Sequence, residues 1–382
     1  MKKPPWRHPR RFRERILSGN LFSRPWPRLS PRARPARFRR TRVLIVGCGD
    51  VGARAARLLL PRVRVLALCR SADKAAALRR LGITPLMGDL DAPATLRRLA
   101  GVAGRVLYLA PPPAQGAGDA RALALARVLR HRARPESLSN IWARRAKARF
   151  GMGCKAQTAA GLNTRRGLAT PQTARCRAFA PANRCWTGSQ ALVYGSTSGV
   201  YGDAQGMPTP ETRPIRPQTA RARRRAAAEA ALRPLGACVL RIPGIYAPDR
   251  AGGTPRVRLA RGTPVLAAPD DVYTSHIHAD DLARACALAL WRGLPRRICN
   301  VCDDSRMKMG DWFDLAARLL ALPCPPRITR AEAEATLPAL QMSFLRESRQ
   351  MTNQRMKSEL RLKLRYPTVK DGLCGELRGM GK

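Results

Sequence analysis

The stretch Val43-Leu-Ile-Val-Gly-Cys-Gly-Asp-Val-Gly52 begins with four apolar residues and ends in a G-x-G-x-x-G motif. The apolar run predicts a buried β-strand, and residues 51–60 have the hydrophobic periodicity of a helix. A lone glycine motif is weak evidence. Here, however, a strand precedes it and a helix follows it, which is the context that a dinucleotide-binding turn requires. A tight turn without a ligand is the alternative.

The three glycines of the motif have separate physical roles. Gly47 permits the tight turn, Gly49 has no Cβ to block a pyrophosphate, and Gly52 lets the helix and the strand pack closely. The phosphates would lie at the helix N-terminus, where free N–H groups and the helix dipole favour anions. Asp50 and Val51 begin that helix, so both belong to the predicted cofactor site.

Strands and helices alternate at regular spacing outward from this stretch. Such alternation predicts an α/β fold with a parallel, doubly wound sheet of the Rossmann type. After residue 250 the pattern is mainly helical, which indicates a smaller C-terminal lobe that closes over the sheet. The expected strands are 43–46, 63–69, 83–87, 106–110, 191–196 and 237–242, and the expected helices are 51–60, 73–81, 92–99, 119–130, 219–232, 279–291, 309–320, 330–337 and 344–359.

Two segments do not share this alternation. Residues 1–40 contain 14 Lys or Arg, one acid and several prolines, and we expect a disordered basic tail there. Residues 131–187 contain 12 Lys or Arg and one acid without sustained periodicity, which predicts an irregular basic insertion in a Rossmann domain spanning 41–250. A lid, a passive insertion and a sequence artefact are the alternatives for this block. Residues 251–382 are the expected substrate lobe, with some return to the sheet.

The charge of the chain is strongly positive. Among 382 residues there are 72 Lys or Arg and 25 Asp or Glu, which gives a formal net charge of +47. Such an excess indicates nucleic acid or an anionic surface as a partner. However, the two basic segments carry +13 and +11 of this charge, and an aromatic content of 5% offers little for base stacking. Nucleic-acid binding is therefore only a second alternative function.

Composition also bears on location and metal content. No window of 18 apolar residues occurs, and residues 1–40 lack the apolar core of a secretory signal. We therefore expect a soluble, cytoplasmic protein with no membrane partner. Cys299 and Cys302 form a C-x-x-C without a second ligand pair at zinc spacing, so we expect packing thiols and no metal site.

The residues after the second and third expected strands bear on cofactor choice. A NAD-binding fold places an acid after the second strand, but this chain has Arg70 and Ser71 there. A cation suits the extra phosphate of NADP, and Ser71 can donate to the same group, so NADP is favoured over NAD. The alternative is that Arg70 is one more surface arginine. Asp89 and Leu90 follow the third strand at the ligand-binding edge, with a helix N-cap as the competing role for Asp89.

Several motifs occur in an order that is more specific than any one of them. Together they resemble an extended short-chain dehydrogenase/reductase of the NAD-dependent epimerase/dehydratase family, over roughly residues 42–130 and 190–375. The resemblance implies a Rossmann domain with a C-terminal substrate lobe that acts on nucleotide sugars or other small carbonyl and alcohol compounds. After the glycine motif, the segments are Gly88-Asp-Leu90, Ser196-Thr-Ser-Gly-Val-Tyr-Gly202, Arg241-Ile-Pro-Gly-Ile-Tyr246, Ile277-His-Ala-Asp-Asp281 and Ile298-Cys-Asn-Val301.

The resemblance also identifies candidate catalytic residues. In the family, a Ser or Thr four residues before the Tyr of the V-Y-G step hydrogen-bonds the reacting oxygen; here this is Thr197, with Ser198 as the alternative. The family's acid/base pair is a Tyr-x-x-x-Lys on the next helix, but this chain has Arg221 and Arg225 in those positions. Arginine is a poor general acid because its pKa lies above 12. We therefore expect the proton to come from Tyr201, a water or the substrate.

Further cofactor contacts follow from the same resemblance. Pro243 and Gly244 lie where the nicotinamide-end loop of the family runs, and Ala110 ends a strand at the ligand-binding edge. Arg225 can still hold ribose or phosphate oxygens, because a guanidinium keeps its charge and forks onto such groups.

Two histidines, His276 and His278, precede an acidic pair. They suggest a metal or a catalytic histidine, but in the family this step starts a helix and packs the lobe. We expect the packing role, with Asp280 as a helix cap.

Three functions are compatible with the sequence. The first is an NAD(P)-dependent oxidoreductase or epimerase with a small-molecule substrate, for which a homodimer is one option. The second is a non-catalytic dinucleotide-binding protein that has lost the Tyr-x-x-x-Lys pair. The third is nucleic-acid binding through the basic segments. The substrate and the oligomeric state stay open.

Overall fold

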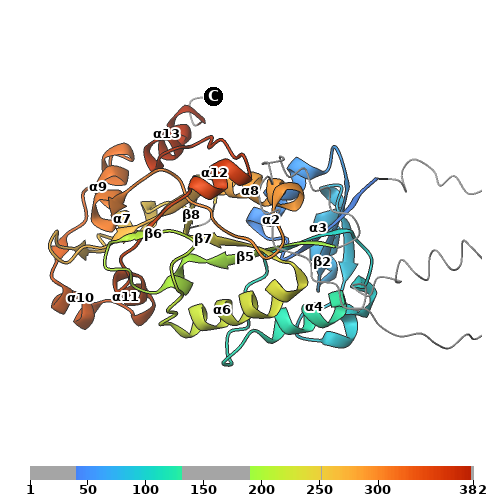
Figure 1. Ribbon diagram of the computed structural model, residues 1–382. Helices are drawn as coiled ribbons and strands as arrows, with labels where there is room; N and C mark the ends of the chain where they lie inside the picture. The colour runs from blue at the N-terminus through green and yellow to red at the C-terminus, as the bar shows by residue number, and fades with distance from the viewer. Residues whose placement is uncertain (1–39, 131–189, 251, 380–382) are drawn as a thin grey trace, which may run out of the picture. The chain divides into compact units, whose positions relative to one another are not determined.

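A seven-stranded parallel sheet lies at the centre of the protein (Figure 1). The computed structural model describes residues 40–130, 190–250 and 252–379. The strand order β12-β7-β5-β4-β1-β2-β3 changes direction beside β1, which confirms the predicted doubly wound, Rossmann-type sheet. The strands are β1 (Arg42–Val46), β2 (Arg64–Cys69), β3 (Thr84–Met87), β4 (Arg105–Tyr108), β5 (Ala191–Thr197), β7 (Cys238–Ile242) and β12 (Ile298–Asn300).

Helices cover both faces of this sheet (Figure 1). Alternate residues of β1 point to opposite faces, as the pleat of a strand requires. Val43 and Ile45 are buried under α2, α3 and α8, whereas Leu44 and Val46 are buried under α4, α6 and the 3-10 helix η1. The covering elements are α2 (Asp50–Leu59), α3 (Ala72–Arg80) and α8 (Ala279–Arg292) on one face, and η1 (Pro93–Leu99), α4 (Ala120–Arg130) and α6 (Ala220–Leu232) on the other.

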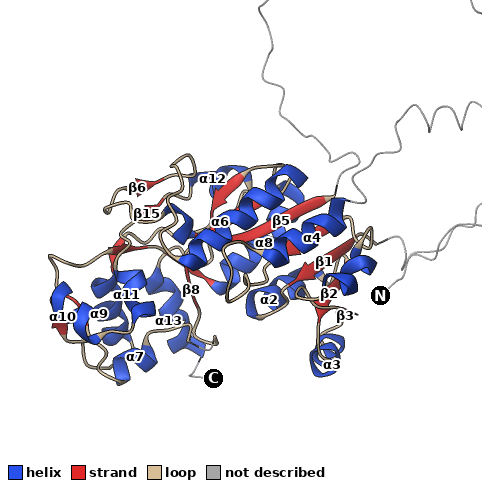
Figure 2. Cartoon of the chain, turned by 90° about the horizontal axis from the view of Figure 1, so that it is seen from below, coloured by secondary structure: helices blue, strands red, loops and turns tan. Residues whose placement is uncertain are grey.

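Most of the remaining elements lie beyond the carboxyl ends of β5 and β7, where α7, α9, α10 and α11 lie together (Figures 1 and 2). The exceptions are η3, which comes directly before β7, and α12, which packs beside β12. Trp312 and Phe313 of α9 pack with Leu259 of α7 in a small separate core. The elements are η2 (Ser198–Tyr201), β6 (Pro208–Thr209), η3 (Arg233–Leu235), β8 (Gly244–Tyr246), α7 (Arg256–Ala260), β9 (Val265–Leu266), β10 (Tyr273–Thr274), β11 (His276–His278), β13 (Met307–Lys308), α9 (Met309–Leu319), β14 (Arg327–Ile328), α10 (Arg330–Thr336), α11 (Ala339–Leu345), β15 (Gln350–Met351), α12 (Gln354–Glu359) and α13 (Val369–Gly379).

The prediction of one helix over residues 344–359 is wrong. The structure divides this segment into the end of α11, the short strand β15 and the helix α12. Between α11 and β15, the Ser348 N–H donates to Asp203 Oδ1 (2.8 Å) and the Ser348 carbonyl accepts from the Ala204 N–H (3.0 Å). These bonds to a distant loop replace bonds within a helix, and a tertiary effect of this kind overrides helix propensity. Residues 92–99, also expected as a helix, form the 3-10 helix η1.

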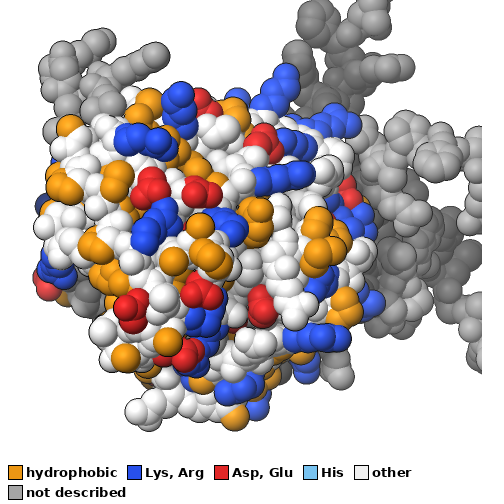
Figure 3. Space-filling model, turned by 90° about the vertical axis from the view of Figure 1, so that its left-hand side faces the viewer, with side chains coloured by type: hydrophobic (Ala, Val, Ile, Leu, Met, Phe, Trp, Pro, Cys, Tyr) orange, Lys and Arg blue, Asp and Glu red, His pale blue; other side chains and the backbone are white. Residues whose placement is uncertain are grey.

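The predicted basic tail and basic insertion fall on residues 1–39 and 131–187, which lie outside the described residues. On the face of the molecule in Figure 3, Asp and Glu side chains lie among the Lys and Arg side chains. Within the described ranges, none of the helices combines the length and the apolar character that crossing a bilayer requires.

Candidate functional site

The glycine turn between β1 and α2 is packed tightly at two glycines and is open at the third. Gly47 has a φ of +92°, and a Cβ added there would lie 2.7 Å from Ala110 Cα. A Cβ on Gly52 would lie 2.8 Å from the Gly47 carbonyl oxygen, so α2 packs directly on the turn. A Cβ on Gly49 would meet nothing within 4 Å. The turn therefore leaves open space where the motif would hold a pyrophosphate.

The side chain of Asp50, at the first residue of α2, is used in ion pairs. Asp50 Oδ1 accepts from Arg54 Nε at 2.9 Å, and Asp50 Oδ2 lies 3.3 Å from Arg250 Nε. Arg54 also pairs with Asp249 and Asp280, each at 2.6 Å. The predicted contribution of Asp50 to a cofactor site is thus limited to its backbone N–H. Val51, which follows it, is half-buried in the first turn of α2.

The residues after β2 lie at the same edge of the sheet. Arg70 is exposed. Ser71 is the N-cap of α3, and its hydroxyl oxygen accepts from the Lys74 N–H at 3.3 Å. An accepting hydroxyl still has its own hydrogen to donate, so Ser71 can cap the helix and contact a ligand.

Asp89 is not a helix N-cap, and that competing prediction is wrong. The 3-10 helix η1 begins at Pro93, with Ala92 at its cap position. Asp89 Oδ1 instead accepts from the Asp91 N–H at 3.0 Å and closes a local turn beside the half-buried Leu90. Side chains of Asp commonly form such turns because their oxygen reaches the N–H two residues on.

A cavity of about 570 Å³ lies between the carboxyl ends of β5 and β7 and the C-terminal helices. Its charge is positive, since five arginines and a single carboxylate line it. Five aromatic side chains provide flat apolar walls. The lining includes the predicted residues Thr197, Ser198, Arg225, Pro243 and Gly244, the further arginines Arg221, Arg250, Arg258 and Arg349, the carboxylate Glu347, and the aromatic residues Tyr246, Tyr273, Trp312, Phe313 and Phe344.

Thr197 ends β5 and is the N-cap of η2, where its hydroxyl oxygen accepts from the Gly199 N–H at 3.3 Å. This places its hydroxyl at the wall of the cavity, with the buried Ser198 next to it. A hydroxyl that accepts one hydrogen bond can still donate to a ligand oxygen.

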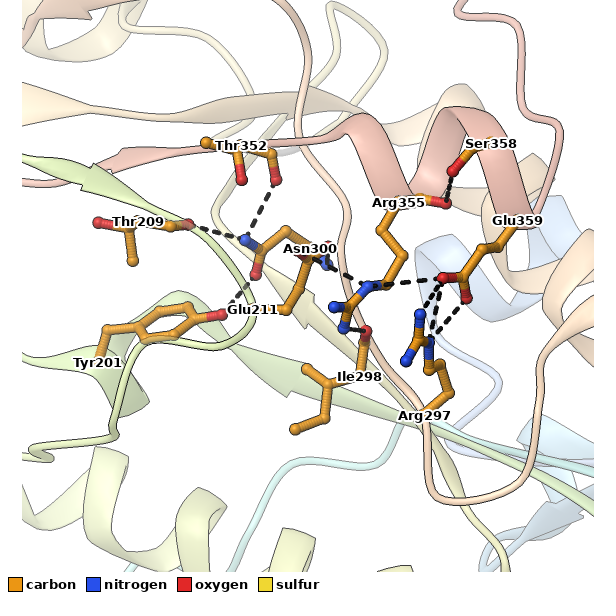
Figure 4. Close-up of polar contacts among 10 residues, drawn as sticks. All are labelled: Tyr201, Thr209, Glu211, Arg297, Ile298, Asn300, Thr352, Arg355, Ser358 and Glu359. Carbon is orange, nitrogen blue, oxygen red and sulfur yellow. Dashed lines mark hydrogen bonds and ion pairs between the residues drawn. The ribbon is translucent and has the colours of Figure 1, made fainter. Parts of the chain in front are cut away.

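Tyr201, in contrast, lies outside the cavity lining. Its side chain is fully buried, and its hydroxyl donates to Asn300 Oδ1 at 2.7 Å (Figure 4). Asn300 is itself fixed, because its Nδ2 donates to the carbonyls of Thr209 and Thr352. Burial raises the pKa of Tyr201. In this structure Tyr201 is a packing residue of a closed network, and the prediction that it supplies the proton to a ligand does not fit this placement.

Arg221 and Arg225 lie four residues apart on α6 and reach the cavity from the same helix face. Arg225 Nη1 donates to the carbonyls of Ala110 (3.2 Å) and Gly195 (3.0 Å) at the ends of β4 and β5. The guanidinium of Arg221 stacks on the ring of Phe344 at 5.0 Å. Arg225 thus connects the predicted residue Ala110 to the cavity wall, and Arg221 faces the C-terminal lobe.

The two histidines of β11 have different surroundings in the structure. His278 is the N-cap of α8, because its Nδ1 accepts from the Asp280 N–H at 3.2 Å. The prediction that Asp280 caps this helix is therefore wrong, and Asp280 pairs with Arg54 instead. His276 lines the cavity, and its Nδ1 is buried with no hydrogen-bond partner among the described residues. Burial lowers the pKa of His276 to about 4, so its imidazole is neutral at physiological pH.

Sequence reasoning missed several residues of this cavity, among them three with ionisable side chains. Arg258, Glu347 and Arg349 lie in segments that belong to no family motif quoted above, and Glu347 falls within the wrongly predicted helix. Arg258 Nε and Glu347 Oε1 are buried and lack partners in the described part of the chain. Because buried polar atoms are normally hydrogen-bonded, these two atoms can still take a hydrogen-bond partner.

One carboxylate behind the cavity gives a pH prediction. Asp303 is 3% exposed, its N–H donates to the His276 carbonyl, and its Oδ2 has no partner among the described residues. Burial raises the pKa of Asp303 from 3.8 to about 8. Between pH 3.8 and about pH 8 the folded state therefore keeps a proton that the unfolded state releases. The contribution of this protonated carboxyl to the free energy of unfolding is complete below pH 3.8 and is lost as the pH rises to about 8.

We expect Asp303→Asn to remove this pH dependence. Between about pH 5 and about pH 9 the melting temperature of the wild type should fall by several degrees more than that of the variant. Thermal unfolding followed by circular dichroism measures this, with Asp73→Asn on the exposed start of α3 as the control. Parallel curves for wild type and Asp303→Asn would contradict the prediction.

Comparison with protein families matches residues 175–302 to the NAD dependent epimerase/dehydratase family. The match covers about a third of the chain. The matched region holds Thr197, both arginines of α6 and the Pro243-Gly244 loop, so it covers most of the cavity's sheet side. No curated protein matches the chain.

Several solved structures have the same fold as this chain. A functionally unknown conserved protein from Silicibacter pomeroyi is 24% identical, with a TM-score of 0.60 over 90% of this chain and 100% of that chain. The UDP-glucose 4-epimerase of Thermotoga maritima, solved with UDP-glucose, is 16% identical, with a TM-score of 0.59 over 90% and 100%. A nucleoside-diphosphate-sugar epimerase from Pseudomonas aeruginosa is 16% identical, with a TM-score of 0.57 over 89% and 98%.

Proposed function

We propose that the protein binds a nicotinamide dinucleotide and catalyses oxidoreduction or epimerisation of a small, anionic carbonyl or alcohol compound. The observation that carries this proposal is the cavity at the carboxyl ends of β5 and β7. It brings Thr197 together with five arginines and lies at the sheet edge where doubly wound folds bind their ligands.

The residues at the glycine turn fit a dinucleotide. Gly49 faces open space, and α2 has no side-chain cap at its N-terminus, so its first N–H groups are available to a pyrophosphate. Arg225, Pro243 and Gly244 would hold the nicotinamide end beside Thr197. When bound, the nicotinamide supplies the acceptor or donor of hydride.

The cavity lining indicates the class of substrate. Five arginines against one carboxylate favour a ligand with phosphate groups, because guanidinium forks onto phosphate oxygens. Aromatic walls such as Trp312 and Phe344 favour a flat ring. A nucleotide sugar combines both features, and the two epimerases described above act on compounds of this class by their names.

NADP is the favoured cofactor because the exposed Arg70 follows β2, where the 2′-phosphate of NADP would lie. We expect Arg70→Ala to weaken NADPH binding by about 10-fold or more, since a charge-assisted hydrogen bond to phosphate is lost, with little effect on NADH. Fluorescence titration with both cofactors measures this. Arg80→Ala, at the exposed end of α3, is the control and should leave both affinities unchanged. Equal losses for NADPH and NADH would contradict the preference for NADP.

The experiment that tests the whole proposal has two steps. Titration of NADPH and NADH fluorescence measures cofactor binding, and a panel of carbonyl compounds and nucleotide sugars is then screened for turnover. Absence of cofactor binding would overturn the proposal. Tight binding without turnover would favour the non-catalytic alternative, which the arginines at the Tyr and Lys positions support.

A further inference from the structure

The proposed function requires a group that exchanges a proton with the ligand, and the family's pair is replaced here by Arg221 and Arg225. Three residues of the cavity lining have buried side-chain atoms without partners among the described residues, namely Arg258 Nε, His276 Nδ1 and Glu347 Oε1. Arg258 keeps its proton at any working pH. His276 is packed against Trp312 at 4.8 Å, and with a pKa of about 4 it is a weak base. Glu347 is the remaining candidate.

The carboxylate of Glu347 is buried, and only one of its two oxygens has a partner among the described residues. Its side chain is 6% exposed, and Oε2 pairs with Arg349 Nη2 at 2.7 Å, while Oε1 has no partner in the described ranges. A carboxylate held in this way has one oxygen that is fixed and one that can accept a proton. The desolvation of such an atom costs free energy unless a ligand completes its hydrogen bonds.

Hydrogen bonds attach the segment that carries Glu347 to the end of the turn that Thr197 begins. Arg349 Nη1 donates to the Gly202 carbonyl at 2.7 Å, and Gly202 directly follows the 3-10 helix η2 that Thr197 caps. The Ser348 N–H also donates to Asp203 at 2.8 Å. The C-terminal segment is thus attached to the end of the same short turn that begins at Thr197.

The segment that carries Glu347 also contacts the helix from which the family's acid/base pair would come, at Arg221, the residue in the Tyr position. The guanidinium of Arg221 stacks on the ring of Phe344, three residues before Glu347, with its Cζ 5.0 Å from the ring centre. The segment 344–349 therefore approaches α6 across the cavity.

We propose that Glu347 is the acid/base residue of this site and exchanges a proton with the ligand oxygen that Thr197 hydrogen-bonds. This inference rests on the proposed function. In the oxidative direction the ligand O–H bond would break and its proton move to Glu347 Oε1, the O–H electron pair would form the second bond of C=O, and the C–H bond at that carbon would break as its hydrogen leaves with the electron pair to the oxidant. The oxidant is the nicotinamide dinucleotide of the proposed function, and in the reductive direction Glu347 returns the proton.

The test compares Glu347→Gln with two matched variants. Glu334→Gln removes an exposed carboxylate that pairs with Arg346 on α10 and α11. Tyr273→Phe removes the hydroxyl of a tyrosine in the cavity lining and keeps its ring. We expect Glu347→Gln to lower kcat by about 100-fold or more, because general acid–base catalysis contributes that much, and to remove one limb of the pH–rate profile. Glu347→Asp should restore part of the rate, the control Glu334→Gln should resemble the wild type, and Tyr273→Phe should keep both limbs of the pH–rate profile.

Two readouts do not depend on turnover. NADPH affinity, measured at a temperature at which both proteins are folded, should be the same in Glu347→Gln and the wild type. The melting temperature of the variant should fall by several degrees, because the buried Arg349 loses its counter-ion. Loss of NADPH affinity in the folded variant would show that the carboxylate is structural and would overturn the inference.

The outcomes of the kinetic comparison are distinct. If Glu347→Gln keeps the turnover rate of the wild type, or if turnover is lost in Tyr273→Phe instead, the proposed role of Glu347 is wrong. The proposed function is not affected by either result. A wild type that binds NADPH but turns over no compound of the panel overturns the proposed oxidoreductase and Glu347 with it.

Discussion

Alanine at Gly49 should weaken dinucleotide binding by about 10- to 100-fold without changing the stability of the protein, whereas alanine at Gly47 should destabilise the fold itself. The two glycines lie two residues apart in one turn. A Cβ on Gly49 meets no protein atom within 4 Å and projects into the space proposed for the pyrophosphate. A Cβ on Gly47 would lie 2.7 Å from Ala110 Cα, at a φ of +92° that favours glycine.

For Gly47→Ala we expect a loss of about 3 kcal/mol or more in the free energy of unfolding, because the backbone of β4 must move and the conformation is strained. Urea unfolding measures this loss, and fluorescence titration with NADPH measures affinity at a temperature where both variants are folded. Unchanged NADPH affinity in Gly49→Ala would show that the pyrophosphate does not lie on this turn. Full stability in Gly47→Ala would contradict the close contact between the turn and β4.

The second large effect is expected at a buried ion pair beneath the cavity. Arg241 on β7 and Glu229 on α6 are 3% and 4% exposed, and Arg241 Nη2 lies 2.8 Å from Glu229 Oε2. The Ser196 hydroxyl donates to the other Glu229 oxygen at 2.6 Å. Arg241→Met would leave the Glu229 carboxylate buried without its counter-ion. Removal of one partner from a buried pair costs about 3–5 kcal/mol, and we expect a loss of that size in urea unfolding.

Two further variants distinguish this explanation from a general effect of losing arginine. The double variant Arg241→Met with Glu229→Gln should recover much of the lost stability, because no unpaired charge then stays buried. Arg297→Met removes the arginine of a more exposed pair with Glu359 (Figure 4), and its cost should stay below about 1 kcal/mol. A loss for Arg241→Met that is no larger than the loss for Arg297→Met would refute the argument.

Local patterns in the sequence were sufficient for the dinucleotide-binding half of the fold. The stretch 43–52 predicted β1, the glycine turn and α2, because hydrophobic periodicity and glycine spacing act over only a few residues. The parallel direction of the strands followed from the alternation of strands and helices, since parallel strands need crossover connections that are usually helices, whereas their order is known from the structure. The prediction of one helix over residues 344–359 also rested on local periodicity, and it was wrong. Hydrogen bonds from Ser348 to a loop more than a hundred residues away in the sequence interrupt the helix there.

The cavity itself was only partly predictable. Thr197, Ser198, Arg225, Pro243 and Gly244 were expected from motifs, and the tertiary structure brings them to one wall. The opposite wall, with Arg258, Glu347 and Arg349, comes from segments without a motif, so no spacing in the sequence indicated it.

The sequence by itself therefore determined the parallel sheet, the glycine turn and the arginines at positions 221 and 225, because each is a matter of residue type at short range. Only the tertiary structure decided which titratable groups reach the cavity. It buries the Tyr201 hydroxyl against Asn300 and leaves Glu347 Oε1 without a partner at the cavity wall. Burial and hydrogen-bond partners depend on contacts between residues far apart in the chain, and these contacts exist only once the C-terminal segment has packed against the sheet.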